Sequence, residues 1–160
     1  SPSRFLQKDG WLMDKVAILA ESKLFELLST EEIEYIAELS RPRRFKAGEQ
    51  IIAEGELGDS LFVAGTGEVE VQRKDAGGTT KLIAVLGPRE FFGEMSLIDK
   101  SYRSATVRAK TDCELLQVSA ENLAAFRKQH RDGFTFLVIN IARVLSSRLR
   151  DANSRLTAHL

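Results

Sequence analysis

The 160-residue sequence is poor in several residue types, and each scarcity narrows the class of protein. It has one cysteine, Cys113, so an internal disulfide is excluded and we expect a buried structural thiol in a cytosolic chain. Its two histidines, His130 and His159, are expected at the surface near helix ends and outside the strand-like runs, so we expect no metal centre. No apolar run approaches the roughly 20 residues that span a bilayer. No signal peptide is visible either, so we expect a cytoplasmic protein with no membrane span.

The sequence also lacks an excess of either charge. Its 23 basic residues balance its 23 acidic residues, and the net charge is zero. Because nucleic-acid binding needs a basic footprint, this balance excludes a general polyanion binder. A basic cluster at residues 41–44 is expected to be the solvated edge of a strand. The apolar fraction of 43% is enough for the core of one compact domain.

Helical periodicity predicts two helices in the first 40 residues. Residues 4–20 carry an apolar face at roughly helical spacing, although Gly10 weakens the first half. Ser29 and Glu32 have the spacing of a capping box, which predicts a second helix near 30–39.

Helical periodicity returns after residue 118. Ser119 is expected to cap a short helix that ends near residue 129, and Asp132-Gly133 is expected to separate this helix from the next. A long helix is then expected from about Phe134. Its predicted apolar stripe consists of Phe134, Leu137, Val138, Ile141, Leu145 and Leu149.

Between these helices the sequence alternates with a period of two. Short strand-like runs separated by glycine turns predict a jelly roll or barrel. The runs are residues 43–45, 50–53, 60–65, 68–72, 80–86, 104–109 and 113–118. The alternation predicts that Val69 and Val71 point inward, and that Val71 and Ile83 both face the barrel interior.

The most informative stretch joins Phe92-Gly93-Glu94-Met95 to Arg103-Ser104. A short helix that starts at Gly93 would point its free backbone N–H groups at an anion. Arg103 would hold a phosphate in a fixed fork geometry. Glu94 would accept a hydrogen bond from a sugar hydroxyl. Together these groups meet the requirements for binding a ribose phosphate without hydrolysing it.

This stretch resembles the phosphate-binding cassette of cyclic-nucleotide-binding domains. The resemblance extends over roughly residues 21–155, because the turn glycines also match, and residues 107–118 look like the bacterial catabolite-activator branch. It implies an α+β fold, an eight-stranded double-stranded β-helix with N-terminal helices and a long C-terminal helix. The expected organisation is a helical extension at 1–20 and the domain at 21–160, with the jelly roll about 41–118 and the C-terminal helices at 119–160.

The resemblance also implies a role for each site residue. Glu94 would bond the ribose 2′-hydroxyl, Arg103 would pair with the cyclic phosphate, and Ser104 would support that phosphate. The backbone of Phe92, Gly93, Glu94 and Met95 would contact the sugar-phosphate. Val71 and Ile83 would pack against the base, and Arg148 of the long helix is the candidate to cover it.

The implied function is a regulatory sensor that binds cAMP in preference to cGMP and performs no chemistry. Ligand binding would reposition the C-terminal helix, with coupling through Leu97 and the apolar stripe at 134–149. Tyr102 stands where many members have a proline, and the Ser104 that follows the arginine occurs in bacterial cAMP receptors.

Three other functions were considered. A cupin-type enzyme would need clustered histidines on the barrel strands, and both histidines lie outside the expected barrel. A transcription factor would need roughly 60–70 further residues for a helix-turn-helix after the long helix, so we expect no direct DNA binding by this chain. An effector domain in a longer protein is an alternative partner for this chain. The last alternative is a degenerate domain that acts as an interaction module or a homodimer through the long helix.

Overall fold

The computed structural model describes the backbone of residues 8–98 and 101–158, and the side chains of residues 14–95, 98 and 101–154. The strands are β1 (Arg41–Phe45), β2 (Gln50–Ile52), β3 (Ser60–Thr66), β4 (Val69–Lys74), β5 (Thr80–Leu86), β6 (Phe91–Phe92), β7 (Thr106–Ala109) and β8 (Cys113–Ser119). The helices are α1 (Lys8–Ala20), the 3₁₀ turn η2 (Lys23–Phe25), α2 (Thr30–Leu39), α3 (Met95–Ile98), α4 (Ala120–Gln129) and α5 (Arg131–Ala158).

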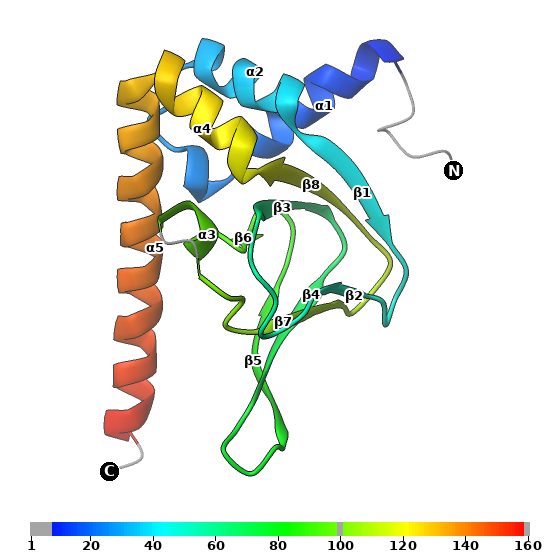
Figure 1. Cartoon of the computed structure of the whole chain (residues 1–160), viewed down its shortest axis with the longest axis vertical. Helices are drawn as coiled ribbons and strands as arrows, with labels where there is room; N and C mark the ends of the chain where they lie inside the picture. Colours follow the sequence, from blue (N-terminus) through cyan, green and yellow to red (C-terminus); the bar gives the residue numbers. More distant parts are fainter. Residues whose placement is uncertain (1–7, 99–100, 159–160) are drawn as a thin grey trace.

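The strands form two four-stranded antiparallel sheets, which confirms the predicted jelly roll. One sheet has the order β1-β8-β3-β6, and the other has the order β2-β7-β4-β5. Helices α1, α2 and α4 gather at one end of the barrel, α5 runs along its side, and the β4–β5 hairpin projects at the far end (Figure 1). We call the first sheet the covered sheet, because helices pack on its outer face, and the second the open sheet.

Two apolar clusters divide the core. One lies between the helices and the outer face of the covered sheet, and the other fills the barrel interior. In β3 the side chains of Leu61 and Val63 point to the first cluster, whereas those of Phe62 and Ala64 point to the second. Because a strand's side chains alternate between faces, β3 is buried on both sides and its sequence shows no polar alternation.

The β4–β5 hairpin corrects one expectation about the barrel interior. Val69 is fully buried and Val71 packs on the interior cluster, as the alternation predicts. Across the ladder, however, Val71 faces Ala84, and the register shifts between Val71 and Gln72. Ile83 is 50% exposed and is not an interior residue. Such a register shift cannot be read from a period-two pattern.

The sequence also gave no signal for β6, because two residues are too few for a period. Phe91 and Phe92 pair with Val63 and Phe62 of β3, and each phenylalanine enters a different cluster. The Phe62 and Phe92 rings stack at a centroid separation of 5.0 Å. This pairing attaches the segment that follows β6 to the covered sheet.

Helix α5 begins earlier than predicted, at Arg131, because Gly133 does not break it. A Cβ at Gly133 would overlap the side chains of Glu32 and Phe126, so this glycine permits close packing between helices. The chain instead turns at His130, the C-cap of α4. His130 is half-buried, with ring centroids 5.1 Å from Tyr35 and 5.3 Å from Phe126, rather than lying at the surface.

The α5 stripe is confirmed in its first half and wrong at its end. Leu137 and Ile141 are fully buried, and Phe134 and Leu145 pack against the helical cluster. Leu149 is 63% exposed, because α5 has passed the helical cluster by this point.

Other sequence predictions are confirmed. The capping box of Ser29 and Glu32 is formed in both directions, and Ser119 caps α4 through the N–H of Asn122. Cys113 is buried, and burial raises the pKa of its thiol to about 11. For the predicted helix at 4–20, residues 4–7 lie outside the described residues, as does His159. No helix in the described part of the chain is long and apolar enough to cross a membrane.

Candidate functional site

A cavity of ≈ 260 Å³ lies between the inner face of the open sheet, the segment after β6, and α5. We call residues 92–98 and 101–105 the cassette segment. The cavity is lined by all of the predicted site residues, which are Val71, Ile83, Phe92, Gly93, Glu94, Met95, Arg103, Ser104 and Arg148. The fold therefore brings together residues from β4, β5, the cassette segment and α5 that are up to 77 positions apart in sequence, from Val71 to Arg148.

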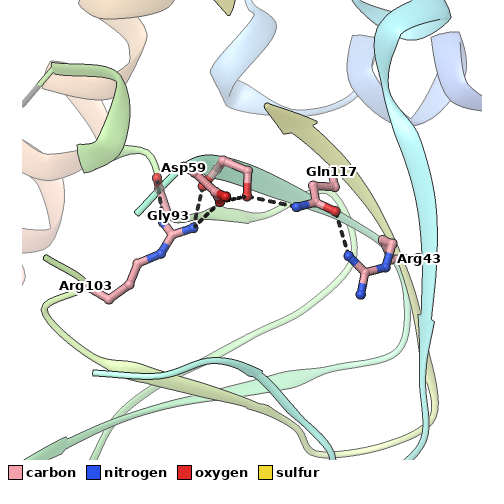
Figure 2. Close-up of polar contacts among 6 residues, drawn as sticks. Arg43, Asp59, Gly93, Arg103 and Gln117 are labelled. Carbon is pink, nitrogen blue, oxygen red and sulfur yellow. Dashed lines mark hydrogen bonds and ion pairs between the residues drawn. The ribbon is translucent and has the colours of Figure 1, made fainter. Parts of the chain in front are cut away.

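Arg103 is the buried cation of this cavity, with only 8% of its surface exposed. Its Nη2 donates to the carbonyl of Ser60 at 2.8 Å, and its Nη1 donates to the carbonyl of Gly93 at 3.2 Å. Asp59 Oδ1 lies 4.0 Å from Nη2. Burial lowers the Arg103 pKa, and Asp59 opposes that shift. These contacts hold the plane of the guanidinium in place (Figure 2).

Gly93 is required beside this cation for two reasons. Its φ is +81°, which side chains disfavour. A Cβ there would also lie 2.8 Å from Arg103 Nη1 and 2.9 Å from the Ser60 carbonyl oxygen. The sequence predicted a helix that starts at Gly93, but α3 starts at Met95, because Gly93 adopts this turn conformation. The backbone around Gly93 thus leaves room for the guanidinium.

Glu94 is the buried carboxylate of the cavity and is 6% exposed. Burial raises its pKa, against the attraction of Arg148 and Arg103. Its Oε1 lies 3.7 Å from Nη1 of Arg148, whose guanidinium also lies 5.6 Å from the centroid of the Phe91 ring. Arg148 is partly exposed, with 41% of its side-chain surface accessible, and its contact with Glu94 joins α5 to the cassette segment.

Part of the cavity wall is apolar. It includes Val71, Ala84 and Leu86 from the open sheet, and Leu145 from α5. Ile83 lines the same wall from its half-exposed position.

Arg73 is a cavity residue that the sequence reasoning missed. It follows Val69 and Val71 at the next inward position of β4, and its Nε donates to the Ser104 carbonyl at 2.9 Å. A charge at an inward position of an otherwise apolar series is the signal that could have revealed it. Ser104 itself is exposed at the cavity edge. The side chain of Leu97, the expected coupling residue, lies outside the described residues.

The cavity combines an anchored cation, a buried carboxylate and an apolar wall. Such a set can hold an anion, a hydroxyl donor and a flat apolar group at the same time. Among the described residues, no group of three or more His, Cys, Asp or Glu residues is placed to hold a metal ion.

Comparisons with known proteins agree with this geometry. A family model described as the cyclic nucleotide-binding domain matches residues 42–130. The chain is 36% identical over 135 residues to the cyclic AMP receptor protein of Thermus thermophilus, covering 84% of this chain and 61% of that protein. It is 34% identical over 137 residues to glutaminase 2 of Bradyrhizobium diazoefficiens, covering 86% of this chain and 21% of that protein.

A solved structure of a cyclic nucleotide-binding domain from Methylobacillus flagellatus shares the fold. Its TM-score is 0.81, with 24% identity, and the match covers 98% of this chain and 94% of that one. The chain thus spans about three fifths of its receptor relative and about a fifth of its glutaminase relative. The family match, the two-sheet jelly roll and the cavity together show that this chain belongs to the cyclic nucleotide-binding domain family.

Proposed function

We propose that this domain is a regulatory sensor that binds cAMP in the cavity between the open sheet and α5. The observation that carries the proposal is that one cavity contains both a buried guanidinium, Arg103, and a buried carboxylate, Glu94. A cyclic nucleotide has one anionic phosphate, one free ribose hydroxyl and one flat base, and the cavity offers a matching group for each.

The phosphate would bind at Arg103. Because Ser60 and Gly93 already hold its guanidinium in place, little conformational entropy is lost when the anion arrives. The backbone of Phe92–Met95 and the exposed Ser104 would complete the contact with the sugar-phosphate.

The ribose hydroxyl would donate to Glu94. Burial of this carboxylate is unfavourable without a donor, as its raised pKa indicates, so a hydroxyl donor is a favourable partner. Val71 and Ile83 would pack against the base on the apolar wall. We favour cAMP because Ser104 follows the arginine, as in bacterial cAMP receptors, and because a named relative is a cyclic AMP receptor protein.

Ligand binding would reposition α5 through Arg148. Arg148 pairs with Glu94 in the structure, so a ribose hydroxyl would compete for the same carboxylate. Arg148 would then turn to cover the base, where a guanidinium stacks well on a purine. The ligand thereby favours one packing of α5 over another.

The proposed sensor is non-enzymatic and cytoplasmic, with no cofactor and no direct DNA contact. It would act on an effector domain in a longer protein, or as a homodimer through α5.

A specific observation favours the interaction role as a second candidate. Large apolar side chains are exposed on β5 and α5, namely Leu82, Ile83, Val85, Ile139 and Leu149. Light scattering at rising concentration tests it, and a monomer throughout would remove the homodimer.

The test of the proposed function is isothermal titration of cAMP into protein that has been unfolded, dialysed and refolded to remove carried ligand. We expect saturable binding near one site per chain, with cGMP binding more weakly. No heat up to millimolar concentrations of either nucleotide would refute it and would leave the interaction role as the leading candidate.

A further inference from the structure

A chain of hydrogen bonds crosses the covered sheet and ends beside the phosphate-site arginine (Figure 2). Arg43 Nη1 on β1 donates to Gln117 Oε1 on β8 at 2.7 Å. Gln117 Nε2 donates to Ser60 Oγ on β3 at 3.0 Å, and Ser60 Oγ donates to Asp59 Oδ1 at 3.1 Å. Asp59 Oδ1 in turn lies 4.0 Å from Arg103 Nη2.

Donor and acceptor chemistry gives this chain one direction. An arginine side chain can only donate, so the amide oxygen of Gln117 must face Arg43 and its NH₂ group must face Ser60. The Ser60 hydroxyl then accepts from Gln117, and its own proton is directed to the Asp59 carboxylate. A cation at one end and an anion at the other polarise every bond between them in the same sense.

Ser60 is the point where this chain meets the ligand site. It is 2% exposed, and its backbone carbonyl accepts the 2.8 Å hydrogen bond from Arg103 Nη2. Its hydroxyl is therefore held from β8 while its carbonyl holds the guanidinium. Ser60 is thus the residue that contacts both Gln117 and Arg103.

Arg43 itself is not the solvated edge residue that the basic cluster predicted. It is half-buried, and its guanidinium lies 5.3 Å from the centroid of the Phe45 ring. Its neighbour Arg44 is exposed and makes a long ion pair, 3.8 Å, with Glu114. Adjacent residues of a strand point to opposite faces, so only Arg43 joins the hydrogen-bond chain.

We infer that Arg43 and Gln117 are positioning residues that orient Arg103 through Ser60 and Asp59. The effect on ligand affinity rests on the proposed function, whereas the effect on the ligand-free Arg103 does not. Neither residue lines the cavity, so each acts only through the covered sheet.

The test compares Arg43→Gln with Arg44→Gln, which removes the same charge from the opposite face of the same strand. The first readout is the ¹⁵N-detected Nε–H signal of Arg103 in ligand-free protein, identified by its loss in Arg103→Lys. The second is cAMP affinity by titration. We expect Arg43→Gln to shift the signal and weaken binding about threefold to tenfold, the range for loss of one hydrogen bond. Arg44→Gln should change neither.

A double-variant cycle separates positioning from general loosening of the sheet. Ser60→Ala keeps the carbonyl that holds Arg103 but breaks the chain at its hydroxyl. In that background Arg43→Gln should have no further effect on the signal or on affinity. Full additivity of the two changes would overturn the inference, as would an Arg43→Gln protein whose Arg103 signal and affinity match the wild type.

The two proposals can fail separately. If the wild type binds neither nucleotide but Arg43→Gln still shifts the Arg103 signal, the proposed function fails and the positioning role stands. If the wild type binds cAMP and Arg43→Gln leaves the signal unmoved, the positioning role fails and the proposed function stands.

Discussion

The two sheets of this barrel are built from similar short strands but have different surroundings. The covered sheet has one face in the helical cluster and the other in the barrel interior, and residues 60–65 of β3 are buried throughout. The open sheet is buried only on its inner face, and most of β5 is exposed. Because more of its apolar surface is buried, we expect the covered sheet to contribute most of the stability, whereas the open sheet supplies a wall of the cavity.

The buried charges of the site lie where these two regions meet. Arg103 leads into β7 of the open sheet, yet its guanidinium is held by the Ser60 carbonyl of the covered sheet. The cavity therefore opens beside the open sheet, whereas the guanidinium of Arg103 within it is held by the covered sheet.

The largest expected effect is on the ligand. Arg103→Ala should cost about 2–5 kcal/mol of cAMP binding, the usual loss when one partner of a buried charge pair is removed. Titration calorimetry measures it, with Arg108→Ala as the control. Arg108 is on β7 outside the cavity and contacts Gln50 at 3.3 Å. Unchanged affinity in Arg103→Ala would show that the site is misassigned.

The difference in stability between the sheets is tested by two leucines. Leu116 on β8 is fully buried in the helical cluster, so Leu116→Ala should destabilise the fold by about 2–5 kcal/mol. Leu82 on β5 is exposed, so Leu82→Ala should change the free energy of unfolding by no more than about 0.5 kcal/mol. Urea denaturation measures both, and equal losses would contradict the comparison.

Crowding at the junction of the two regions is tested by a pair of glycines. Gly93→Ala and Gly48→Ala both place a side chain at positive φ, at a cost of about 1–2 kcal/mol each. Only Gly93→Ala also crowds Arg103 and Ser60, because nothing lies within 4 Å of a Cβ at Gly48. We therefore expect the larger loss of stability in Gly93→Ala, and loss of cAMP affinity in Gly93→Ala alone. Equal affinities would show that the guanidinium moves aside freely.

The buried carboxylate of the site predicts a pH dependence. Because burial raises the Glu94 pKa above its ordinary 4.5, the folded state binds more protons than the unfolded state over the interval between the two values. Stability should thus fall as pH rises from about 4.5 through the raised pKa. Glu94→Gln should lack this fall and be more stable than the wild type at pH 7. Thermal denaturation across pH measures it, and parallel curves would contradict it.

The smallest expected effect belongs to the contact between α5 and the cassette segment. The Arg148–Glu94 pair has a partly exposed cation, so Arg148→Gln should change the free energy of unfolding by less than about 1 kcal/mol. It should still weaken cAMP binding severalfold, because the base loses its cover. Arg150→Gln, an exposed α5 residue that contacts Ser146, is the control. Identical affinity in the two variants would remove Arg148 from the site.

The sequence was sufficient for features that depend on local chemistry. Capping boxes, turn glycines and period-two alternation act over a few residues, so α2, the start of α4 and the inward positions of β4 could be predicted from them. Resemblance to a family then supplied the eight-strand topology and the candidate site. The prediction failed at Gly133, because a glycine that interrupts a helix and one that permits close helix packing look alike in a sequence.

Only the tertiary structure decided which distant groups meet. The sequence by itself determined the element types, a single buried thiol and the glutamate and arginine of the cassette. It did not determine the Arg148–Glu94 pair, the inward Arg73 or the path from Arg43 to Arg103, since these join residues from separate strands and helices. Local signals extend over a few residues. These contacts instead depend on strand register and helix placement, which are established only when the whole core packs.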